Sequence, residues 1–266
     1  MFYRRWKRAL CALSAALLFA APVHAATVTV DGTPLSADQG WGENGTSYIT
    51  LRALAEHGGY ELSWDGQRAV LTGEGLHLTA APGQLYLEVN GRALYIEEGV
   101  GSADGKIHLP LRTVADATGA TLLWDSETTT AALALKNTVP PQADYDEDGL
   151  YWLSRIISAE SRGEVLLGQL AVGSVVLNRV AHRNYPDSIR GVVFDDNYGI
   201  QFEPVSNGTV YDEPVPSAVL AAKMCLEGAS VVGDSLYFYA PALSPGTWIV
   251  ENGIYYTTIG CHKFYE

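Results

Sequence analysis

The first half of the chain contains two copies of one pattern, and this repeat constrains the fold more than any other feature. Residues 51–65 (LRALAEHGGYELSWD) return as residues 111–125 (LRTVADATGATLLWD), with the matching Leu, Arg, Trp and Asp 60 positions apart. Self-similarity at a fixed spacing indicates one supersecondary unit that is used twice. Each copy predicts a short helix that a glycine ends, then a strand that carries the Trp, a turn and another strand.

The segment between the two copies predicts a β-hairpin. Residues 83–96 alternate apolar and polar side chains around Asn90-Gly91, a dipeptide typical of tight hairpin turns. We therefore expect residues 26–136 to form a β-rich domain with two small helices. Within it, Trp64 and Trp124 are expected to fill the core of each repeat in preference to forming exposed platforms for sugar rings.

The doubled pattern Leu-Arg-x-[Leu/Val]-Ala-[Glu/Asp]…Trp-Asp resembles the copper amine oxidase N-terminal-like domain, a stalk module of many secreted bacterial wall proteins. The resemblance spans nearly all of residues 27–136 and implies an accessory or wall-targeting role, with no copper and no chemistry. His57, His77 and His108 include no pair at metal-ligand spacing. We expect no metal site and no cofactor, and the ligand of this domain stays open.

The first 25 residues are typical of a signal peptide. Basic residues at positions 4–8, an apolar run at 9–20 and the small-residue site Val23-His24-Ala25 predict cleavage after Ala25. The apolar run is too short to span a bilayer comfortably. We therefore expect a secreted protein that is associated with the cell wall and has no membrane attachment after cleavage.

The charge of the chain disfavours several classes of partner. Its formal net charge is −13, and loss of the four basic residues of the signal peptide takes it to −17. A surface this acidic repels nucleic acid and anionic membranes, which favours a neutral or mixed-charge substrate such as a glycan–peptide polymer. The same acidity is equally consistent with a role in solubility alone.

The mature chain keeps two cysteines, Cys225 and Cys261. In an oxidising compartment they could pair, or they could remain buried thiols that behave as small apolar residues, and the sequence leaves both open. Neither is expected to be a thiol-protease nucleophile, because the adjacent His262 would point to the opposite face of a strand from Cys261.

Residues 137–148 (NTVPPQADYDED) predict a linker that two adjacent prolines stiffen and acidic residues solvate. The acids imitate the beginning of a calcium loop, but Arg155 occupies the position at which such a loop needs a bidentate Glu. We expect Asp148 to cap the next helix instead. Residues 149–266 are then expected to form a mainly helical α+β domain around the apolar helix of residues 168–180.

Residues 150–164 (LYWLSRIISAESRGE) predict the helix that opens this domain. At 100° per residue, Glu160 falls in the same apolar stripe as Leu153 and Ile157. Desolvation there raises the pKa of a carboxyl group, and a protonated carboxylic acid can donate a proton to a leaving group. The alternative is a glutamate that ends the helix and bonds a neighbouring backbone group or arginine.

Loops in the second half of the chain combine amide, hydroxyl and aromatic groups, a mixture suited to a cleft for sugars. The candidate substrate-binding residues in these loops are Gln201, Phe202, Ser206, Tyr239 and His262. Glu164 is a sixth candidate, because residues four apart are neighbours on a helix. We interpret it as an orienting or structural partner, since two carboxylates of one helix would approach the sugar from the same side.

Residues 149–266 resemble the SleB-type cell wall hydrolases, the spore cortex-lytic and related peptidoglycan-cleaving enzymes. The matching stretches follow the family order and are residues 159–164, 168–172, 176–180, 201–205, 237–238 and 262–265. The resemblance implies a compact, lysozyme-like catalytic domain and places the family's essential glutamate at Glu160. The departures are Ser161, where Ala is commoner, and Cys261, which is often Asn.

The resemblance implies a lytic transglycosylase that cleaves peptidoglycan between N-acetylmuramic acid and N-acetylglucosamine. Glu160 would protonate the glycosidic oxygen and then act as base while the muramic C6 hydroxyl attacks C1, so no second carboxylate is needed. The alternatives are an N-acetylmuramoyl amidase, which would need metal ligands that the sequence does not offer, and a non-catalytic wall-binding protein. Hydrolysis or transglycosylation, vegetative wall or spore cortex, partner proteins and oligomeric state stay open.

Overall fold

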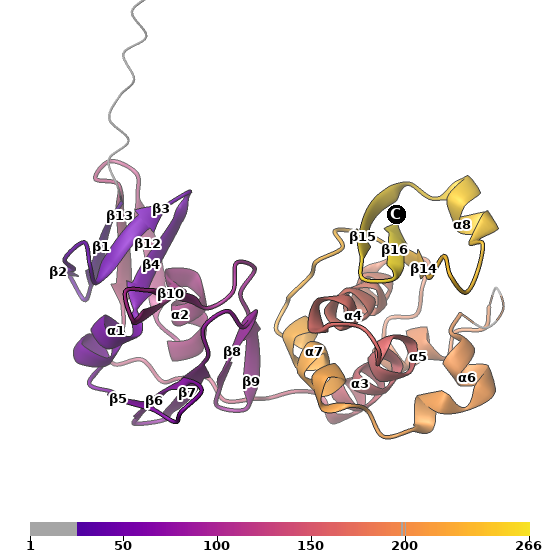
Figure 1. Cartoon of the computed structure of the whole chain (residues 1–266), viewed down its shortest axis with the longest axis horizontal. Helices are drawn as coiled ribbons and strands as arrows, with labels where there is room; N and C mark the ends of the chain where they lie inside the picture. The colour runs from indigo at the N-terminus through magenta and orange to yellow at the C-terminus, as the bar shows by residue number, and fades with distance from the viewer. Residues whose placement is uncertain (1–25, 198, 200) are drawn as a thin grey trace, which may run out of the picture.

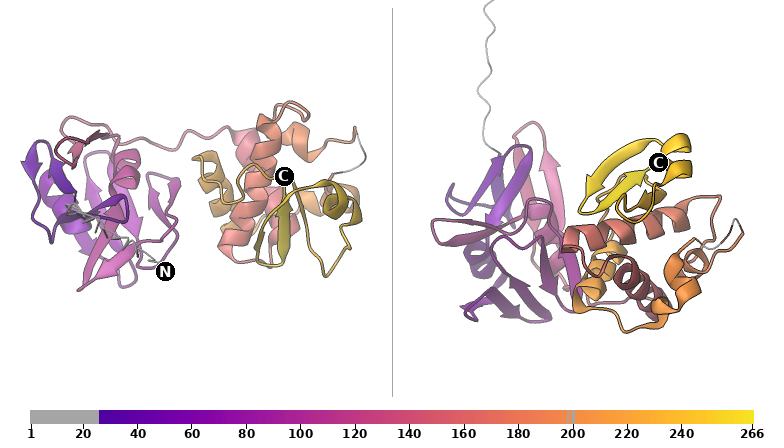
Figure 2. Two further views of the ribbon diagram at one scale, coloured as in Figure 1. Left: turned by 90° about the horizontal axis from the view of Figure 1, so that it is seen from above. Right: turned by 45° about the vertical axis from the view of Figure 1, so that its right-hand side comes forward.

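The computed structural model describes residues 26–197, 199 and 201–266, in which a β-rich part precedes a helical part (Figure 1). Figure 2 shows the same two parts from two further directions. The expected α+β class, with a β-rich N-terminal part and a mainly helical C-terminal part, is confirmed. The predicted signal peptide lies outside the described residues. No described helix is long and apolar enough to cross a membrane.

The N-terminal elements form three small sheets around one hydrophobic core. In chain order they are β1 (Thr27–Val30), β2 (Thr33–Pro34), β3 (Gly40–Glu43), β4 (Thr46–Thr50), α1 (Leu51–Gly58), β5 (Glu61–Trp64), β6 (Ala69–Gly73), β7 (Leu76–Ala80), β8 (Tyr86–Val89), β9 (Arg92–Tyr95), β10 (Gly101–Ala103), β11 (Lys106–Pro110), α2 (Leu111–Thr118), β12 (Thr121–Asp125) and β13 (Thr130–Ala134). The strand orders are β12-β13-β1-β2, β10-β11-β4-β3 and β5-β6-β7-β8-β9.

The two copies of the sequence repeat adopt the same local structure, as predicted. Helices α1 and α2 begin at the repeated leucines, and Gly59 and Gly119 follow them with φ of +69° and +71°. Glycine populates this left-handed region without the steric cost of a Cβ, so it ends both helices. The antiparallel pairs β5–β6 and β12–β13 come next, and β8–β9 forms the predicted hairpin.

The prediction that Trp64 and Trp124 fill the core is wrong. Their side chains are 55% and 58% exposed. Both residues lie on edge strands, β5 and β12, where only Leu62 and Leu122 are packed against the core. Leu62 and Leu122 share a strand face with the tryptophans, so the core covers this face near the beginning of each strand and leaves its end exposed.

The C-terminal part packs helices around α4, the apolar helix that the sequence predicts. Its elements are α3 (Glu147–Ser161), α4 (Leu166–Ala181), α5 (Ile189–Val193), α6 (Glu203–Asn207), the 3₁₀-helix η1 (Thr209–Tyr211), α7 (Pro216–Leu226), β14 (Tyr237–Tyr239), α8 (Thr247–Asn252), β15 (Tyr255–Ile259) and β16 (His262–Tyr265). At Gly173 of α4, a Cβ would lie 2.6 Å from Cys225 Sγ and 2.7 Å from Ile157 Cδ1. Glycine therefore allows α3 and α7 to approach α4 closely.

The first helix of this part begins earlier than the sequence suggests. Asp146 is the N-cap, because its Oδ2 accepts a hydrogen bond of 2.7 Å from the backbone N–H of Gly149. Asp148, the predicted cap, lies in the first turn and accepts a hydrogen bond of 3.0 Å from Trp152 Nε1. The prediction of the cap is therefore wrong by two residues.

The described structure has no disulfide bond, because Cys225 and Cys261 are both free. Cys225 is buried between α7 and α4, and its Sγ donates to the backbone oxygen of Leu170 at 3.6 Å. Burial raises the pKa of the Cys225 thiol to about 12, so the thiol stays protonated and inert. The alternative of two buried thiols therefore holds for Cys225 and is wrong for Cys261, which is exposed in the β15–β16 turn.

The hairpin β8–β9 connects the two parts through polar contacts that are partly buried, in addition to the chain that runs between them. Arg92 Nε donates to Glu227 Oε1 at 3.0 Å, and the same carboxylate accepts from the Tyr145 hydroxyl at 2.8 Å. Lys223 of α7 donates to a backbone oxygen of the β8–β9 turn at 2.8 Å. Ala93 belongs to the hydrophobic core of the helical part. The hairpin β8–β9 is therefore docked against α7 (Figure 1).

We expect Arg92→Ala to loosen the contact between the two parts. The Arg92 and Glu227 side chains are only 13% and 14% exposed, so removal of the arginine leaves a largely desolvated carboxylate without its opposite charge, held by the Tyr145 hydroxyl. The expected cost is about 2 kcal/mol of unfolding free energy, together with faster proteolysis between β13 and α3. Calorimetry and limited proteolysis measure the two effects.

Lys106→Ala provides the control, because Lys106 forms an ion pair with Asp38 in which both side chains are well exposed. Solvent screens such a pair, so this variant should melt like the wild type. Equal melting temperatures and equal rates of proteolysis for the two variants would contradict a structural role for Arg92.

Candidate active site

Glu160 lies in the last turn of α3, beside the most tightly packed part of the helical core. Leu153, Ile156 and Ile157 on the same helix are 0% exposed, so the apolar face is buried as predicted. Glu160 itself is partly buried. Within the described part of the chain, no hydrogen bond or ion pair restrains its carboxyl group. The group therefore combines restricted hydration with freedom to meet a ligand.

Burial is the main reason that the pKa of the Glu160 carboxyl rises from 4.5 to about 7. The negative charge of Glu203 raises the pKa further, and the positive charge of Arg179 lowers it. A carboxyl group with this pKa is protonated in a substantial fraction of molecules at neutral pH. It can donate a proton, and its conjugate base can accept one.

Arg179 is a buried cation near this carboxyl that the sequence interpretation overlooked. It is 5% exposed, and its Nε donates to the backbone oxygen of Leu236 at 2.7 Å. Its guanidinium carbon lies 5.1 Å from the ring centre of Phe202 and 5.2 Å from that of Tyr185. An arginine in a helix made mostly of apolar residues is the signal that could have identified it. Its charge keeps the pKa of Glu160 from rising higher.

Glu203 was also missed, although it belongs to a stretch that the family resemblance includes. It is exposed at the beginning of α6, a short helix that packs against α3. Gln201 is partly exposed just before it, where its side-chain nitrogen donates to the Gly199 oxygen at 2.9 Å. Ser206 is exposed and donates to the backbone oxygen of Glu203 at 2.8 Å. The structure thus gathers Gln201, Glu203 and Ser206 in one segment beside α3.

The carboxylate of Glu164 is hydrogen-bonded to the turn between β15 and β16. Its carboxylate accepts from the backbone N–H of Cys261 at 3.2 and 3.3 Å, and its Oε1 lies 3.7 Å from His262 Nδ1. The turn is so close that a Cβ on Gly260 would lie 1.8 Å from Glu164 Oε2. These contacts support the interpretation of Glu164 as an orienting or structural residue.

The other predicted binding residues differ in their access to solvent. Phe202 is 2% exposed and packs in the core, so it cannot contact a substrate directly and instead supports Arg179. His262 is 7% exposed, and burial lowers its pKa, which favours the neutral imidazole. Tyr239 is partly exposed on β14, with its ring centre 6.0 Å from that of Tyr265.

Exposed aromatic rings cover the small sheet β14-β16-β15 and the neighbouring helix α8. Trp248 and Tyr255 are 59% and 53% exposed. Their ring centres lie 5.4 Å from Tyr237 and 5.6 Å from Tyr265, respectively. Rings of this kind stack on the C–H faces of sugars. Figure 1 shows this sheet and α8 on the same side of the helical part.

The described residues contain no group of three or more His, Cys, Asp or Glu side chains arranged to hold a metal ion. His57, His77 and His108 of the N-terminal part form no such group. His108 instead packs against both Trp41 and Tyr48, at ring-centre distances of 4.9 and 5.6 Å.

Each of the two parts of the chain matches a known protein family. Residues 163–265 match the family described as Cell Wall Hydrolase, and residues 29–133 match the Copper amine oxidase N-terminal domain. The chain therefore combines a copper amine oxidase N-terminal domain with a cell wall hydrolase domain. Glu160 lies just before the matched range of the second family.

Spore cortex-lytic enzymes are among the relatives of the C-terminal part. The chain is 32% identical over 105 residues to the enzyme of Bacillus cereus, which covers 40% of this chain and 39% of that protein. It is 29% identical over 105 residues to the enzyme of Bacillus subtilis, covering 40% of this chain and 33% of that protein. The chain thus spans about two fifths or less of the length of these curated relatives.

Similar solved structures include the catalytic domain of the germination-specific lytic transglycosylase SleB from Bacillus anthracis. The identity is 30%, the match covers 47% of this chain and 100% of that chain, and the TM-score is 0.43. The catalytic domain of the Bacillus cereus SleB protein gives 30% identity, coverage of 46% and 93%, and a TM-score of 0.42.

We expect Glu160→Gln to stabilise the fold in a pH-dependent manner. The carboxyl is protonated in both states below pH 4.5, so the burial penalty is absent there. As the pH rises from 4.5 through about 7, the unfolded chain loses the proton first and folding becomes less favourable. The neutral glutamine should therefore stabilise the protein by up to roughly 3 kcal/mol at pH 8 and little at pH 4.5.

Urea unfolding at the two pH values measures this difference. Glu251→Gln, at an exposed position of α8, is the matched control. Its free energy of unfolding relative to the wild type should be the same at the two pH values. A Glu160→Gln variant that is equally stabilised at both pH values would show that the carboxyl is not desolvated.

Proposed function

We propose that the chain is a peptidoglycan-cleaving enzyme of the lytic transglycosylase type, with Glu160 as its general acid and base. The observation that carries the proposal is a partly buried carboxyl group with a pKa of about 7 at the end of the helix that leads into a cell wall hydrolase domain. The reaction type rests on the sequence resemblance of residues 149–266 to the SleB-type cell wall hydrolases. The name of the matched family supports a cell-wall substrate, and the name of the curated relatives, spore cortex-lytic enzyme, supports spore cortex.

The chemistry requires a single group that first gives and then takes a proton. Protonated Glu160 donates to the oxygen between N-acetylmuramic acid and N-acetylglucosamine as the C1–O bond breaks. The resulting carboxylate then accepts the proton of the muramic C6 hydroxyl while that oxygen bonds to C1. The product is a 1,6-anhydro ring, and no water is consumed. A pKa near neutrality suits both steps.

The two charged neighbours of Glu160 have opposite effects on this cycle. Glu203 favours retention of the proton before cleavage, and its negative charge also stabilises positive charge that develops at C1. Arg179 stabilises the carboxylate form that must act as base. Together they hold the pKa of Glu160 where both forms are accessible.

The position of Glu203 favours one alternative outcome, which is hydrolysis. Glycosidases that use water have a second carboxylate on the other side of the bond from the acid. Glu203 belongs to a different helix from Glu160, so it is better placed for that role than Glu164, which is bonded to the β15–β16 turn. Hydrolysis yields reducing muramic acid ends, whereas transglycosylation yields anhydro ends.

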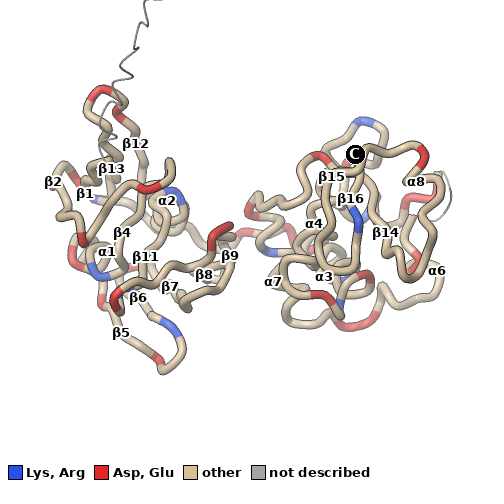
Figure 3. The backbone as a smooth tube through the Cα atoms, turned by 45° about the horizontal axis from the view of Figure 1, so that its top comes forward, with Lys and Arg blue, Asp and Glu red and all other residues tan. Residues whose placement is uncertain are grey.

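We further propose that the protein is secreted and acts at the cell wall, on vegetative wall or spore cortex. The support is the signal-like sequence of residues 1–25 and the acidic character of the chain. Figure 3 shows acidic residues along both parts, with fewer lysines and arginines. Such a surface accommodates an uncharged amino-sugar strand better than a polyanion.

Glu160→Gln is expected to reduce the release of muropeptides from purified walls by about 100-fold or more, because glutamine can neither donate nor accept the proton. Mass spectrometry of the released products provides the measurement and separates anhydro from reducing ends. Glu251→Gln on α8 is the control and should release products at the wild-type rate. Freed stem peptides would identify an amidase, and equal clearing by wild type and Glu160→Gln would end the proposal.

Glu203→Gln is expected to move the alkaline limb of the pH–rate profile to lower pH. The protonated acid is required, so activity falls as the pH rises through the pKa of Glu160, and loss of the Glu203 charge lowers that pKa. A pH series of initial rates measures the shift. An unshifted limb would show that Glu203 does not act on Glu160. A switch from reducing to anhydro ends would instead assign Glu203 to the activation of water.

A further inference from the structure

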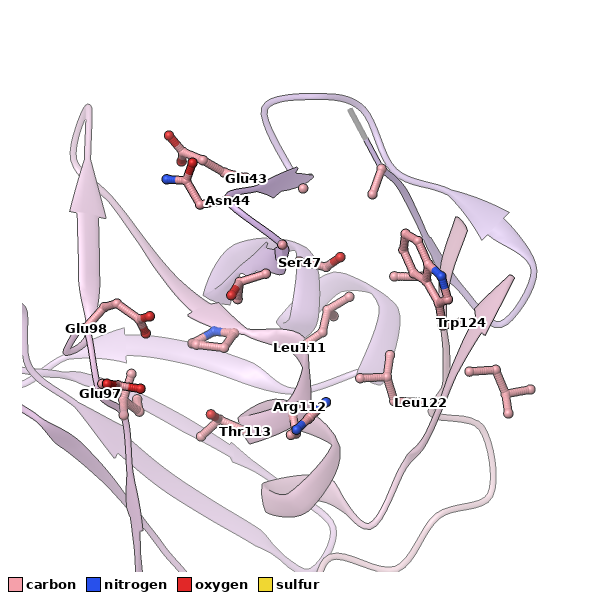
Figure 4. Close-up of a pocket in the computed structure, with 18 of the residues that line it drawn as sticks. Glu43, Asn44, Ser47, Glu97, Glu98, Leu111, Arg112, Thr113, Leu122 and Trp124 are labelled. Carbon is pink, nitrogen blue, oxygen red and sulfur yellow. The ribbon is translucent and has the colours of Figure 1, made fainter. Parts of the chain in front are cut away.

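A cavity of about 810 Å³ opens in the N-terminal part, away from Glu160 and unused by the proposed reaction. It lies between the β3–β4 turn, the segment after β9, the beginning of α2 and strand β12 (Figure 4). Its volume is within the range of small-ligand sites, roughly 300–1,000 Å³. The cavity is therefore large enough to hold a ligand of a few rings.

The cavity presents an apolar surface with one large exposed ring. Ile96, Leu111 and Ala131 are buried residues of its lining, and Leu122 is partly buried. Trp124 forms one side, with its indole 58% exposed (Figure 4). Among the described residues, no aromatic ring or cation stacks on this indole. An uncovered indole beside an apolar surface offers a flat face to a ligand.

Polar groups surround that surface, and three of them are carboxylates. Glu97 and Glu98 lie on the side opposite Trp124, and Glu43 lies near Asn44 at the β3–β4 turn (Figure 4). The cation of the lining is Arg112 at the beginning of α2. Three carboxylates against one guanidinium disfavour an anionic ligand and favour one rich in hydroxyl or amide donors.

We propose that this cavity binds an uncharged segment of an amino-sugar chain. The C–H face of a sugar ring packs on Trp124, while ring hydroxyls and N-acetyl N–H groups donate to Glu43, Glu97 and Glu98. The existence of the site follows from the cavity, whereas the identity of the glycan as the wall polymer rests on the proposed function. The N-terminal domain then holds the same polymer that the C-terminal domain cleaves.

The sequence repeat provides a matched control. Trp64 occupies the position equivalent to Trp124, lies on the edge strand β5 and is 55% exposed, but it does not line the cavity. The two tryptophans therefore share exposure and local structure and differ in the presence of a binding cavity. Replacement of either one should leave the fold intact, which circular dichroism checks.

The experiment uses the full mature chain carrying Glu160→Gln, so that the glycan is not cut while binding is measured. Sedimentation with purified peptidoglycan, stripped of anionic wall polymers, gives the retained fraction. We expect Trp124→Ala to weaken retention roughly ten-fold and Trp64→Ala to leave it unchanged. Wild-type retention by Trp124→Ala would overturn the proposal. Equal losses in both variants would also overturn it, because exposed indoles in general would then be responsible.

Two further measurements distinguish glycan binding in this cavity from a role in catalysis and from the binding of a charged peptide group. In the catalytically intact chain, Trp124→Ala should slow the clearing of insoluble wall several-fold and leave the cleavage of short soluble glycan fragments unchanged. Retention should also be the same at low and high salt, since the ligand is uncharged; a strong salt dependence would indicate a cationic peptide group and overturn the glycan assignment. If no variant or wild type cleaves wall but Trp124→Ala still loses retention, the proposed function fails and the binding site stands.

Discussion

The proposed chemistry depends on the partial removal of one carboxyl group from water. Glu160 follows a helix face that is completely buried, and that face reaches α4 because Gly173 lets Ile157 and Cys225 come within van der Waals distance of the backbone. A larger residue at Gly173 would push α3 outward and rehydrate its end. The pKa of about 7 is thus a consequence of helix packing, which Glu203 and Arg179 adjust in opposite directions.

The same packing assigns different roles to two glutamates four residues apart. Glu160 is still helical, and its carboxyl group has no hydrogen-bond or ion-pair partner among the described residues, whereas α3 ends at Ser161 and the chain turns before Glu164. Glu164 therefore faces the β15–β16 turn, where it accepts the N–H of Cys261. A carboxylate held in this way stabilises the sheet that carries the exposed aromatic rings. Helical spacing alone could not separate the two residues, because it assumes that the helix continues.

Patterns that depend on local packing were predictable, and those that depend on distant segments were not. The repeat, the apolar helix around Gly173 and the stripe that contains Glu160 follow from periodicity, and the structure has each of them. The exposure of Trp64 and Trp124 depends on which strands end at a sheet edge, which pairing across the sheet decides. The influence of Glu203 on Glu160 joins residues more than 40 positions apart and has no sequence pattern.

The contact between the two domains fixes their relative orientation, and this matters if both domains bind one polymeric substrate, as proposed. Arg92, Tyr145 and Glu227 form one largely buried hydrogen-bonded group, so the N-terminal domain does not hang on a free tether. The two proposed sites, on a docked pair of domains, would meet one polymer at a fixed separation, so that the second contact would form at a high effective concentration. A flexible linker would provide proximity without orientation. Formation of the largely buried ion pair costs desolvation energy. The pair contributes a defined orientation of the two domains.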